Sequence, residues 1–272
     1  AIEKLNQLKT LEPSNTAIDK KLAEIYYLKN DFSKAADAYS RFAMGPTANE
    51  EDLVKYAFAL FLNHDFAKSL EVANMGLKKN PRHAAFNRLA MYNNTDLKRF
   101  EEALKAADVF FNECDKADYS YLDYMYYGHL LEELKKYDEA VGQYEKAVEL
   151  DPTKTDLYKN ISSAYEQKND YKKAIGAYHK YYSSLEKEKQ TPDLQFQLGR
   201  LYYGAGTQPD SLTINAEERK QALMSADSVF QVISEAAPDS YLGNFWRARA
   251  NSALDPETTQ GLAKPFYEEV AA

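Results

Sequence analysis

A short pattern that recurs about every 34 residues constrains the fold of this chain more than any other feature. Its clearest copy is YDEAVGQYEKAVELDP at residues 137–152, in which aromatic residues and alanines alternate at helical spacing before a proline. Copies of the pattern align when units start at residues 16, 50, 84, 121, 155, 192 and 241. Self-similarity at a period of this length predicts a repeat architecture in which each unit packs on its neighbours.

Each unit contains two stretches with the apolar periodicity of an amphipathic helix. The second stretch begins with an aromatic residue in most units, and a small residue stands near the middle of the first stretch. These small residues are Ala23, Ala57, Gly128, Ser162, Gly199 and Ala248. Small side chains at a contact let two helix axes approach closely, so we expect helix–turn–helix pairs throughout and an all-α fold.

The unit at 121–154 carries the fullest pattern, and it resembles the tetratricopeptide repeat (TPR). The matching residues are Tyr127, Gly128, Leu131, Tyr137, Ala140, Tyr144, Ala147 and Pro152. The resemblance, to bacterial TPR proteins in particular, extends over essentially the whole chain. It implies a right-handed superhelical solenoid whose first helices line a concave surface, and this surface usually receives a peptide or a partner's helix.

We expect one continuous solenoid domain. Its expected parts are the second helix of a truncated repeat (1–15), TPR units at 16–49, 50–83, 84–120, 121–154 and 155–191, a TPR unit at 192–240 with an inserted loop at 204–219, and a partial or terminal unit at 241–272. Both ends fall inside a repeat, and the last helix keeps an apolar face where a polar cap is usual. We therefore expect a fragment of a longer array, or ends that are covered by a partner.

The insertion at 204–219 is the largest departure from the repeat. Its Gly, Pro, Asp and Ser content predicts a loop, and Asn215 followed by Glu218 predicts the start of a helix. Insertions in repeat proteins often lie on a binding face, but long surface loops are also tolerated without a function. Both interpretations remain open for this segment.

The sequence contains no motif for catalysis or metal binding. The net charge is −8, which argues against a surface for nucleic-acid phosphates. One cysteine and four histidines offer no zinc spacing, and His64 is expected to be a turn residue between two helices. No phosphate-binding glycine loop occurs, and no segment has the apolar length of a membrane span. We expect neither an enzyme nor a cofactor, and no direct membrane insertion.

The resemblance directs attention to one stripe of the first helices. The predicted groove residues are Tyr27, Phe58, Phe61, Tyr92, Met125, His129, Lys159, Phe196, Arg200, Tyr203, Phe245 and Arg249. Exposed aromatic residues and arginines are the usual anchors of protein interfaces, although each ring could instead pack on a neighbouring helix. Trp246 is expected to pack between repeats. The family's clamp for chaperone tails is absent, because Glu24, Phe58 and Ala85 occupy its places.

These features predict a non-catalytic scaffold that binds a polypeptide segment in its concave groove. The alternative is a structural segment of a larger envelope or multi-domain protein that associates with itself through open array ends. The identity of the partner is unknown from the sequence. The tyrosine-rich repeats without the clamp resemble bacterial TPR proteins, several of which work at the cell envelope. This resemblance favours the periplasm or cell envelope as the compartment and leaves the cytoplasm open.

Overall fold

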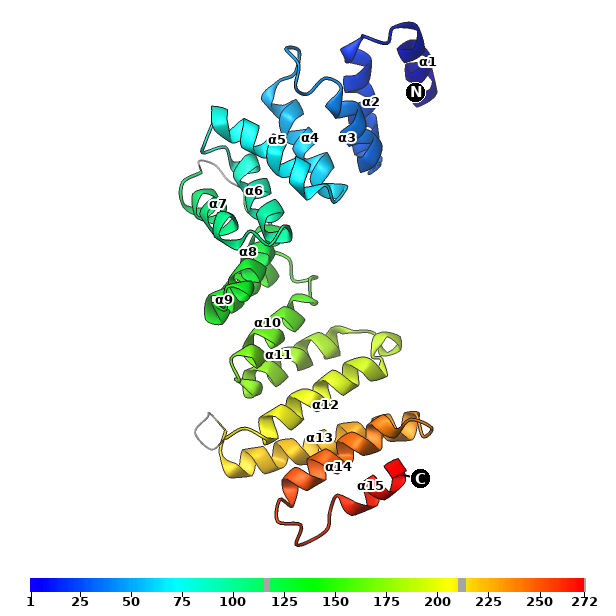
Figure 1. Ribbon diagram of the computed structural model, residues 1–272, viewed down its shortest axis with the longest axis vertical. Helices are drawn as coiled ribbons and strands as arrows, with labels where there is room; N and C mark the ends of the chain where they lie inside the picture. The colour runs from blue at the N-terminus through cyan, green and yellow to red at the C-terminus, as the bar shows by residue number, and fades with distance from the viewer. Residues whose placement is uncertain (115–117, 210–213, 272) are drawn as a thin grey trace. The chain divides into compact units, whose positions relative to one another are not determined.

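The computed structural model describes residues 1–114, 118–209 and 214–271 (Figure 1). These residues form fifteen α-helices and one short 3-10 helix, and no β-strand occurs among them. The all-α fold expected from the repeated pattern is confirmed.

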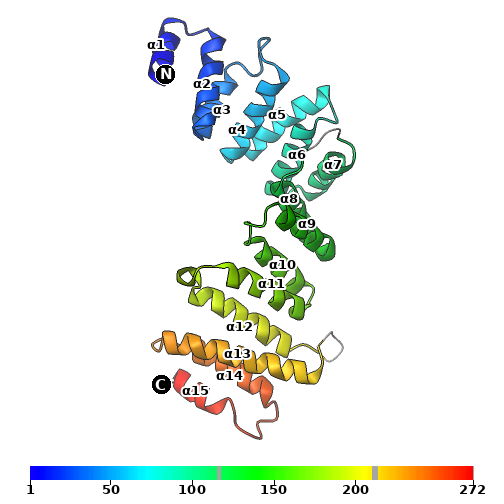
Figure 2. The same ribbon diagram turned by 180° about the vertical axis from the view of Figure 1, so that it is seen from behind.

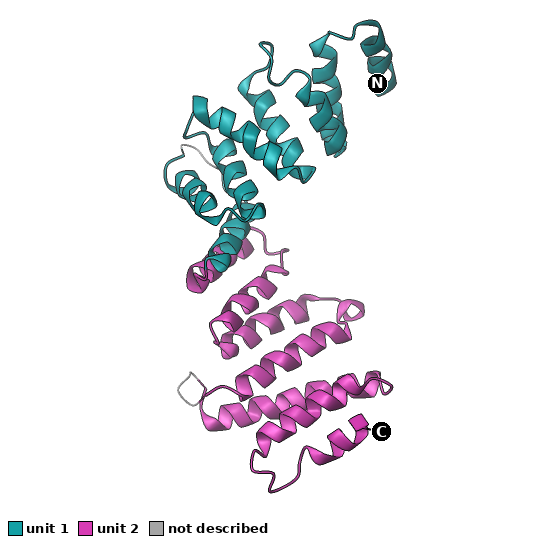
Figure 3. Ribbon diagram, in the orientation of Figure 1, with its two compact units in different colours: residues 1–134 teal, residues 135–272 magenta. Residues whose placement is uncertain are grey.

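The chain divides into two compact units, residues 1–134 and 135–272, which are described separately (Figure 3). The helices of unit 1 are α1 (Ile2–Leu11), α2 (Thr16–Leu28), α3 (Phe32–Ser40), α4 (Glu50–Leu62), α5 (Phe66–Lys79), α6 (Ala84–Asp96), α7 (Phe100–Asn112) and α8 (Tyr121–Glu133). Those of unit 2 are α9 (Tyr137–Leu150), α10 (Leu157–Gln167), α11 (Tyr171–Ser184), the 3-10 helix η1 (Lys187–Lys189), α12 (Pro192–Gly206), α13 (Ala216–Ala236), α14 (Tyr241–Leu254) and α15 (Lys264–Ala271).

Within each unit, helices pack on their near neighbours along the chain. The hairpins α2–α3, α4–α5 and α6–α7 form in unit 1, and α10–α11 and α12–α13 form in unit 2. Helices α12, α13 and α14 lie side by side in both views of the chain (Figures 1 and 2). The even-numbered helices from α2 to α14 come first in the expected repeats, and we call them the first helices. The division into repeats itself stays a prediction.

Five short connections between consecutive helices share one backbone conformation. One residue per turn adopts a positive φ between 57° and 61°, namely Asn30, His64, Lys98, Lys135 and Asn169. These residues all stand at the fifteenth place of the expected units. A left-handed residue lets the chain leave one helix and enter the next within about four residues. The expectation that His64 is a turn residue is confirmed.

Small residues permit the close packing of the helices. The six small residues predicted at the middle of the first helices are all buried. Some contacts leave no room even for a methyl group: a Cβ atom on Gly199 would lie 2.7 Å from the ring of Phe230. On Gly243 it would lie 2.6 Å from the backbone nitrogen of Ser234. Because α14 approaches the backbone of α13 so closely, glycine is required at this crossing.

The longest expected unit departs from the prediction. Helix α12 continues to Gly206 and α13 begins at Ala216, so the predicted loop at 204–219 is too long at both ends. Residues 210–213 of that loop lie outside the described residues. Gly204 lies within α12 and Gly206 is its last residue. A Cβ atom at these positions would meet the Tyr171 ring at 2.3 Å and the Leu223 side chain at 2.4 Å, so both glycines permit close packing.

Part of the extra length of this unit goes into α13, which has 21 residues. The predicted start of that helix is confirmed. The Asn215 side chain accepts a hydrogen bond from the Glu218 backbone N–H at 2.9 Å, and the Asn215 N–H donates to the Glu218 carboxylate at 3.0 Å. This reciprocal pair satisfies two of the otherwise unpaired donors at the start of the helix.

Candidate functional site

In unit 1, basic residues on one first helix pair with an aspartate at the start of the next first helix. The Lys20 ammonium lies 2.8 Å from the Asp52 carboxylate. Arg88 donates to both oxygens of Asp123, from Nε at 2.7 Å and from Nη2 at 3.0 Å. Asp123 is fully buried, with 0% of its surface exposed. These cations join consecutive first helices, so their charge is already neutralised within unit 1.

Tyr92 is part of the same network, and the prediction that it lines a groove is wrong. Only 3% of its surface is exposed, and its hydroxyl donates to Asp123 at 2.7 Å. Its ring stacks on that of Tyr126 at 4.1 Å. Burial, and then the negative charge of Asp123, raise the pKa of Tyr92, so the hydroxyl stays protonated. The residue faces the next first helix and holds it in place.

The other predicted residues of unit 1 remain at least partly exposed: Tyr27, Phe58, Phe61, Met125 and His129. Several of these side chains support their neighbours. The ring of Phe61 lies 5.4 Å from that of Tyr92, and Tyr27 meets Phe32 edge-on at 5.7 Å. Phe58 packs against the hydrophobic core of the unit. The stripe in unit 1 therefore acts mainly in packing, and His129 is its exposed member.

In unit 2 the equivalent stripe forms a different structure, which we call the aromatic–arginine cluster. Its members are Phe196 and Tyr203 of α12, Phe230 of α13, and Phe245, Trp246 and Arg249 of α14. The Trp246 ring is central: its centroid lies 5.4 Å from that of Tyr203, 5.4 Å from that of Phe230 and 5.6 Å from that of Phe196. Phe230 is fully buried, whereas the other five residues are half-buried. The cluster thus rests on the core and keeps one side exposed.

Arg249 lies against the rings of this cluster. Its guanidinium carbon is 4.6 Å from the centroid of Trp246, 5.0 Å from that of Tyr203 and 6.0 Å from that of Phe245. Its Nη2 approaches the Tyr203 hydroxyl at 3.5 Å, which is long for a hydrogen bond. Cation–π contact with several rings orients the guanidinium without using its N–H donors.

The two remaining predicted cations lie on neighbouring first helices of unit 2. Arg200 contacts Glu166 of α10 at 3.8 Å, and its side chain is 45% exposed. Lys159 is exposed, and its ammonium lies 5.3 Å from the Tyr181 ring. Lys159 and Glu166 also line a cavity of about 350 Å³ between α10 and α12. The structure therefore brings Phe196, Tyr203, Phe245 and Arg249 together and places Arg200 and Lys159 outside their contacts.

Sequence reasoning missed two members of these aromatic groups. Phe230 was not singled out because it belongs to a second helix, and Tyr126 stands one residue beside the predicted stripe in α8. The prediction that Trp246 packs between repeats agrees with its contacts to rings of α12 and α13, which belong to the preceding expected unit. A signal for Phe230 existed: Gly199, opposite it, leaves the space that a large ring fills.

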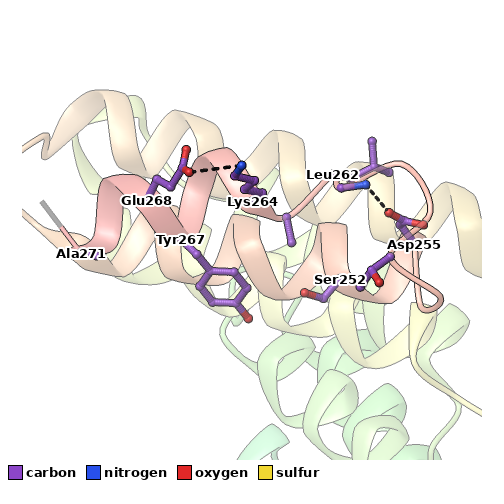
Figure 4. A pocket seen from close by; sticks show the side chains of 10 residues that line it. Ser252, Asp255, Leu262, Lys264, Tyr267, Glu268 and Ala271 are labelled. Atoms are coloured by element: carbon purple, nitrogen blue, oxygen red, sulfur yellow. Dashed lines mark hydrogen bonds and ion pairs between the residues drawn. The ribbon is translucent and has the colours of Figure 1, made fainter.

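A further cavity, of about 550 Å³, lies between α14 and α15 (Figure 4). At its edge Asp255 accepts hydrogen bonds from the backbone N–H groups of Gln260 at 2.9 Å and Gly261 at 2.7 Å. Burial opposes ionisation of this carboxyl, but these bonds prevail and lower its pKa. The Asp255 carboxylate therefore stabilises the loop before α15 through these hydrogen bonds. No observation points to a ligand in this cavity.

Within the described ranges, no group of three or more His, Cys, Asp or Glu side chains is placed to hold a metal ion. No helix in that part of the chain is long and apolar enough to cross a membrane. The described first helices carry partly exposed aromatic rings and cations, which are residue types that take part in non-covalent protein binding.

Comparison with known proteins identifies relatives with the same repeat fold. The family model of the tetratricopeptide repeat matches residues 122–154, and no curated protein matches the sequence. The solved C-terminal part of a TPR repeat-containing protein from Cytophaga hutchinsonii is 30% identical, with 80% of this chain and 77% of that chain covered and a TM-score of 0.59. A tetratricopeptide repeat protein from Parabacteroides merdae is 17% identical, with 100% and 91% covered and a TM-score of 0.55.

A fragment of MamA from Desulfovibrio magneticus is also similar in fold, at 18% identity and a TM-score of 0.55, with 65% of this chain and 97% of that chain covered. The fold defines an all-helical repeat protein, of a kind typical of protein-interaction scaffolds. The chain belongs to the tetratricopeptide repeat family, which is typically non-catalytic.

Proposed function

We propose that this chain is a non-catalytic scaffold that binds a segment of a partner polypeptide through the aromatic–arginine cluster of unit 2. The observation that carries the proposal is the gathering of five half-buried aromatic and arginine side chains from two first helices, α12 and α14. Tyr, Trp and Arg are the residues most enriched at the energetic centres of protein interfaces.

The cluster is organised before a partner arrives. Trp246 is stacked on Phe230 with an angle of 28° between the rings, and Phe196 meets Trp246 edge-on at 85°. Side chains that are already ordered lose little conformational entropy when they bind. A partner that covers the exposed side of these rings therefore gains apolar burial at a low entropic cost.

The proposal can be tested with a photoreactive amino acid, benzoylphenylalanine, placed at Phe245 of the full-length protein. A matched control places it at Tyr119, an aromatic residue of unit 1 that is 38% exposed. Irradiation in the source cells, followed by mass spectrometry, identifies what lies against each position. We expect a distinct protein crosslinked through position 245, and the yield should fall when Arg249→Met is added.

Three other outcomes count against the proposal. Equal crosslinking from both positions would show that the cluster has no special role. Crosslinks only to a second copy of the chain would favour the self-associating alternative. Turnover of a metabolite by the pure chain would contradict a non-catalytic scaffold.

A further inference from the structure

Arg249 differs in its charge partners from two other arginines that lie against aromatic rings in the described part of the chain, Arg88 and Arg247. Arg88 lies 5.1 Å from the centroid of Phe110, and Arg247 lies 4.2 Å from that of Phe266. Each of these arginines also grips an aspartate with Nε and Nη2. The distances from Arg88 to Asp123 are 2.7 and 3.0 Å, and those from Arg247 to Asp227 are 3.0 and 3.5 Å.

Arg249 also lies against aromatic rings, but it is not paired with an aspartate of the described residues. Among the described residues it has no carboxylate partner, and its one polar contact is the Tyr203 hydroxyl at 3.5 Å. It is half-buried, so its charge is partly removed from water. A guanidinium in this situation gains from a carboxylate that can accept two parallel hydrogen bonds.

We propose that Arg249 is a subsite for one acidic side chain, aspartate or glutamate, of the polypeptide segment that binds the cluster. The pairs Arg88–Asp123 and Arg247–Asp227 show the expected geometry. In each pair, Nε and Nη2 of a ring-stacked arginine donate to the two oxygens of one carboxylate. The Tyr203 hydroxyl, which accepts the long bond from Arg249, retains its own proton to donate to the incoming carboxylate. This inference rests on the proposed function and specifies the chemistry of the partner.

The neighbouring charges favour a carboxylate over a phosphate. Arg200, the predicted groove cation on α12, already lies 3.8 Å from the Glu166 carboxylate. A single arginine neutralises one carboxylate charge, whereas a phosphate carries up to two. The flanking rings of Phe196 and Phe245 suit apolar side chains beside the acidic one. We therefore expect a segment with an aspartate or glutamate next to aromatic or aliphatic residues.

The test uses a phage-displayed library of random peptides, selected on the intact chain. Recovered peptides are synthesised with blocked ends and titrated by the fluorescence of Trp246, the only tryptophan. We expect the best peptides to contain an acidic residue, and its change to Asn or Gln should weaken binding about tenfold or more. Arg249→Met keeps an apolar stem over Trp246, and in this variant the change of the acidic peptide residue to Asn or Gln should alter the dissociation constant less than twofold. In the control Lys159→Met, the same peptide change should weaken binding as much as in the unchanged protein.

The remaining outcomes separate this inference from the proposed function. If the peptides depend on Phe196 and Phe245 but show no acidic preference, the carboxylate subsite is wrong and the scaffold stands. The subsite is equally wrong if the preference survives in Arg249→Met, if only a free C-terminal carboxylate binds, or if inorganic phosphate displaces the peptide while acetate does not. If no recovered peptide depends on Phe196 or Phe245, the proposed function fails as well.

Discussion

One arginine of unit 1 and one arginine of unit 2 lie in similar aromatic surroundings but differ in their charge partners. Arg88 in unit 1 and Arg249 in unit 2 both lie on first helices and against aromatic rings. Arg88 is bound to the buried Asp123 of the next first helix, while Arg249 has no acidic partner in the described part of the chain. The difference shows that an arginine on a first helix stabilises the packing of the chain where the chain supplies its anion, and the proposed function assigns Arg249 to a partner because no described residue supplies one.

The largest expected effect tests this comparison directly. Arg88→Met leaves the carboxylate of Asp123 buried without its counter-charge, and loss of one partner of such a pair costs about 3 kcal/mol or more. We expect a corresponding loss in the free energy of unfolding, measured by urea denaturation with far-UV circular dichroism. The matched variant Arg249→Met removes no internal ion pair and should cost less than about 1 kcal/mol. Equal losses in the two variants would remove the distinction between the arginines.

A second prediction concerns the way in which unit 2 holds its helices together. If close steric fit dominates there, Gly243→Ala should destabilise the unit by about 2 kcal/mol, because the new methyl group meets the backbone of Ser234 at 2.6 Å. Gly142→Ala is the control: no atom lies within 4 Å of the added methyl group, and alanine favours a helix by up to about 1 kcal/mol. Urea denaturation followed by Trp246 fluorescence measures both. A tolerated Gly243→Ala would show that α14 can shift away from α13.

A third prediction compares one turn from each unit. Lys98 has a positive φ of 57°, and a non-glycine residue with this backbone is strained by about 1 kcal/mol. Lys98→Gly should therefore raise the melting temperature of the chain by a few degrees. Asn169→Gly in unit 2 should raise it less, because asparagine tolerates the left-handed conformation better than lysine does. A fall in melting temperature for Lys98→Gly would mean that its side chain stabilises the turn.

The smallest expected effect is on the pH dependence of stability. The lowered pKa of Asp255 in unit 2 contributes stability that is present above the unfolded pKa of about 3.9 and is lost as the pH falls through the folded pKa. In unit 1, partial removal from water raises the pKa of Asp96, so protonation in acid relieves a cost there. We expect Asp255→Asn to flatten the loss of stability below about pH 4. Thermal melts at each pH would contradict this if the slope stayed the same.

The sequence predicted the helices and their local chemistry well. The left-handed turn at His64 and the reciprocal cap of Asn215 and Glu218 follow from residues close together in the chain. The position of Tyr92 did not follow, because its burial depends on Asp123, which is 31 residues away on another first helix. The loop at 204–219 was overestimated for a similar reason: Gly204 looks like a helix end until Tyr171 is known to lie against it.

The left-handed turns have a consequence for the way the chain is made. The turns inside α2–α3, α4–α5, α6–α7 and α10–α11 let the two helices of each pair meet, and the helices that make extensive contacts in the described part are consecutive or next but one along the chain. A hairpin of this kind forms without waiting for distant segments. During synthesis, each pair of helices can therefore form its local contacts soon after it leaves the ribosome, and it becomes stable as it packs on the neighbouring pair.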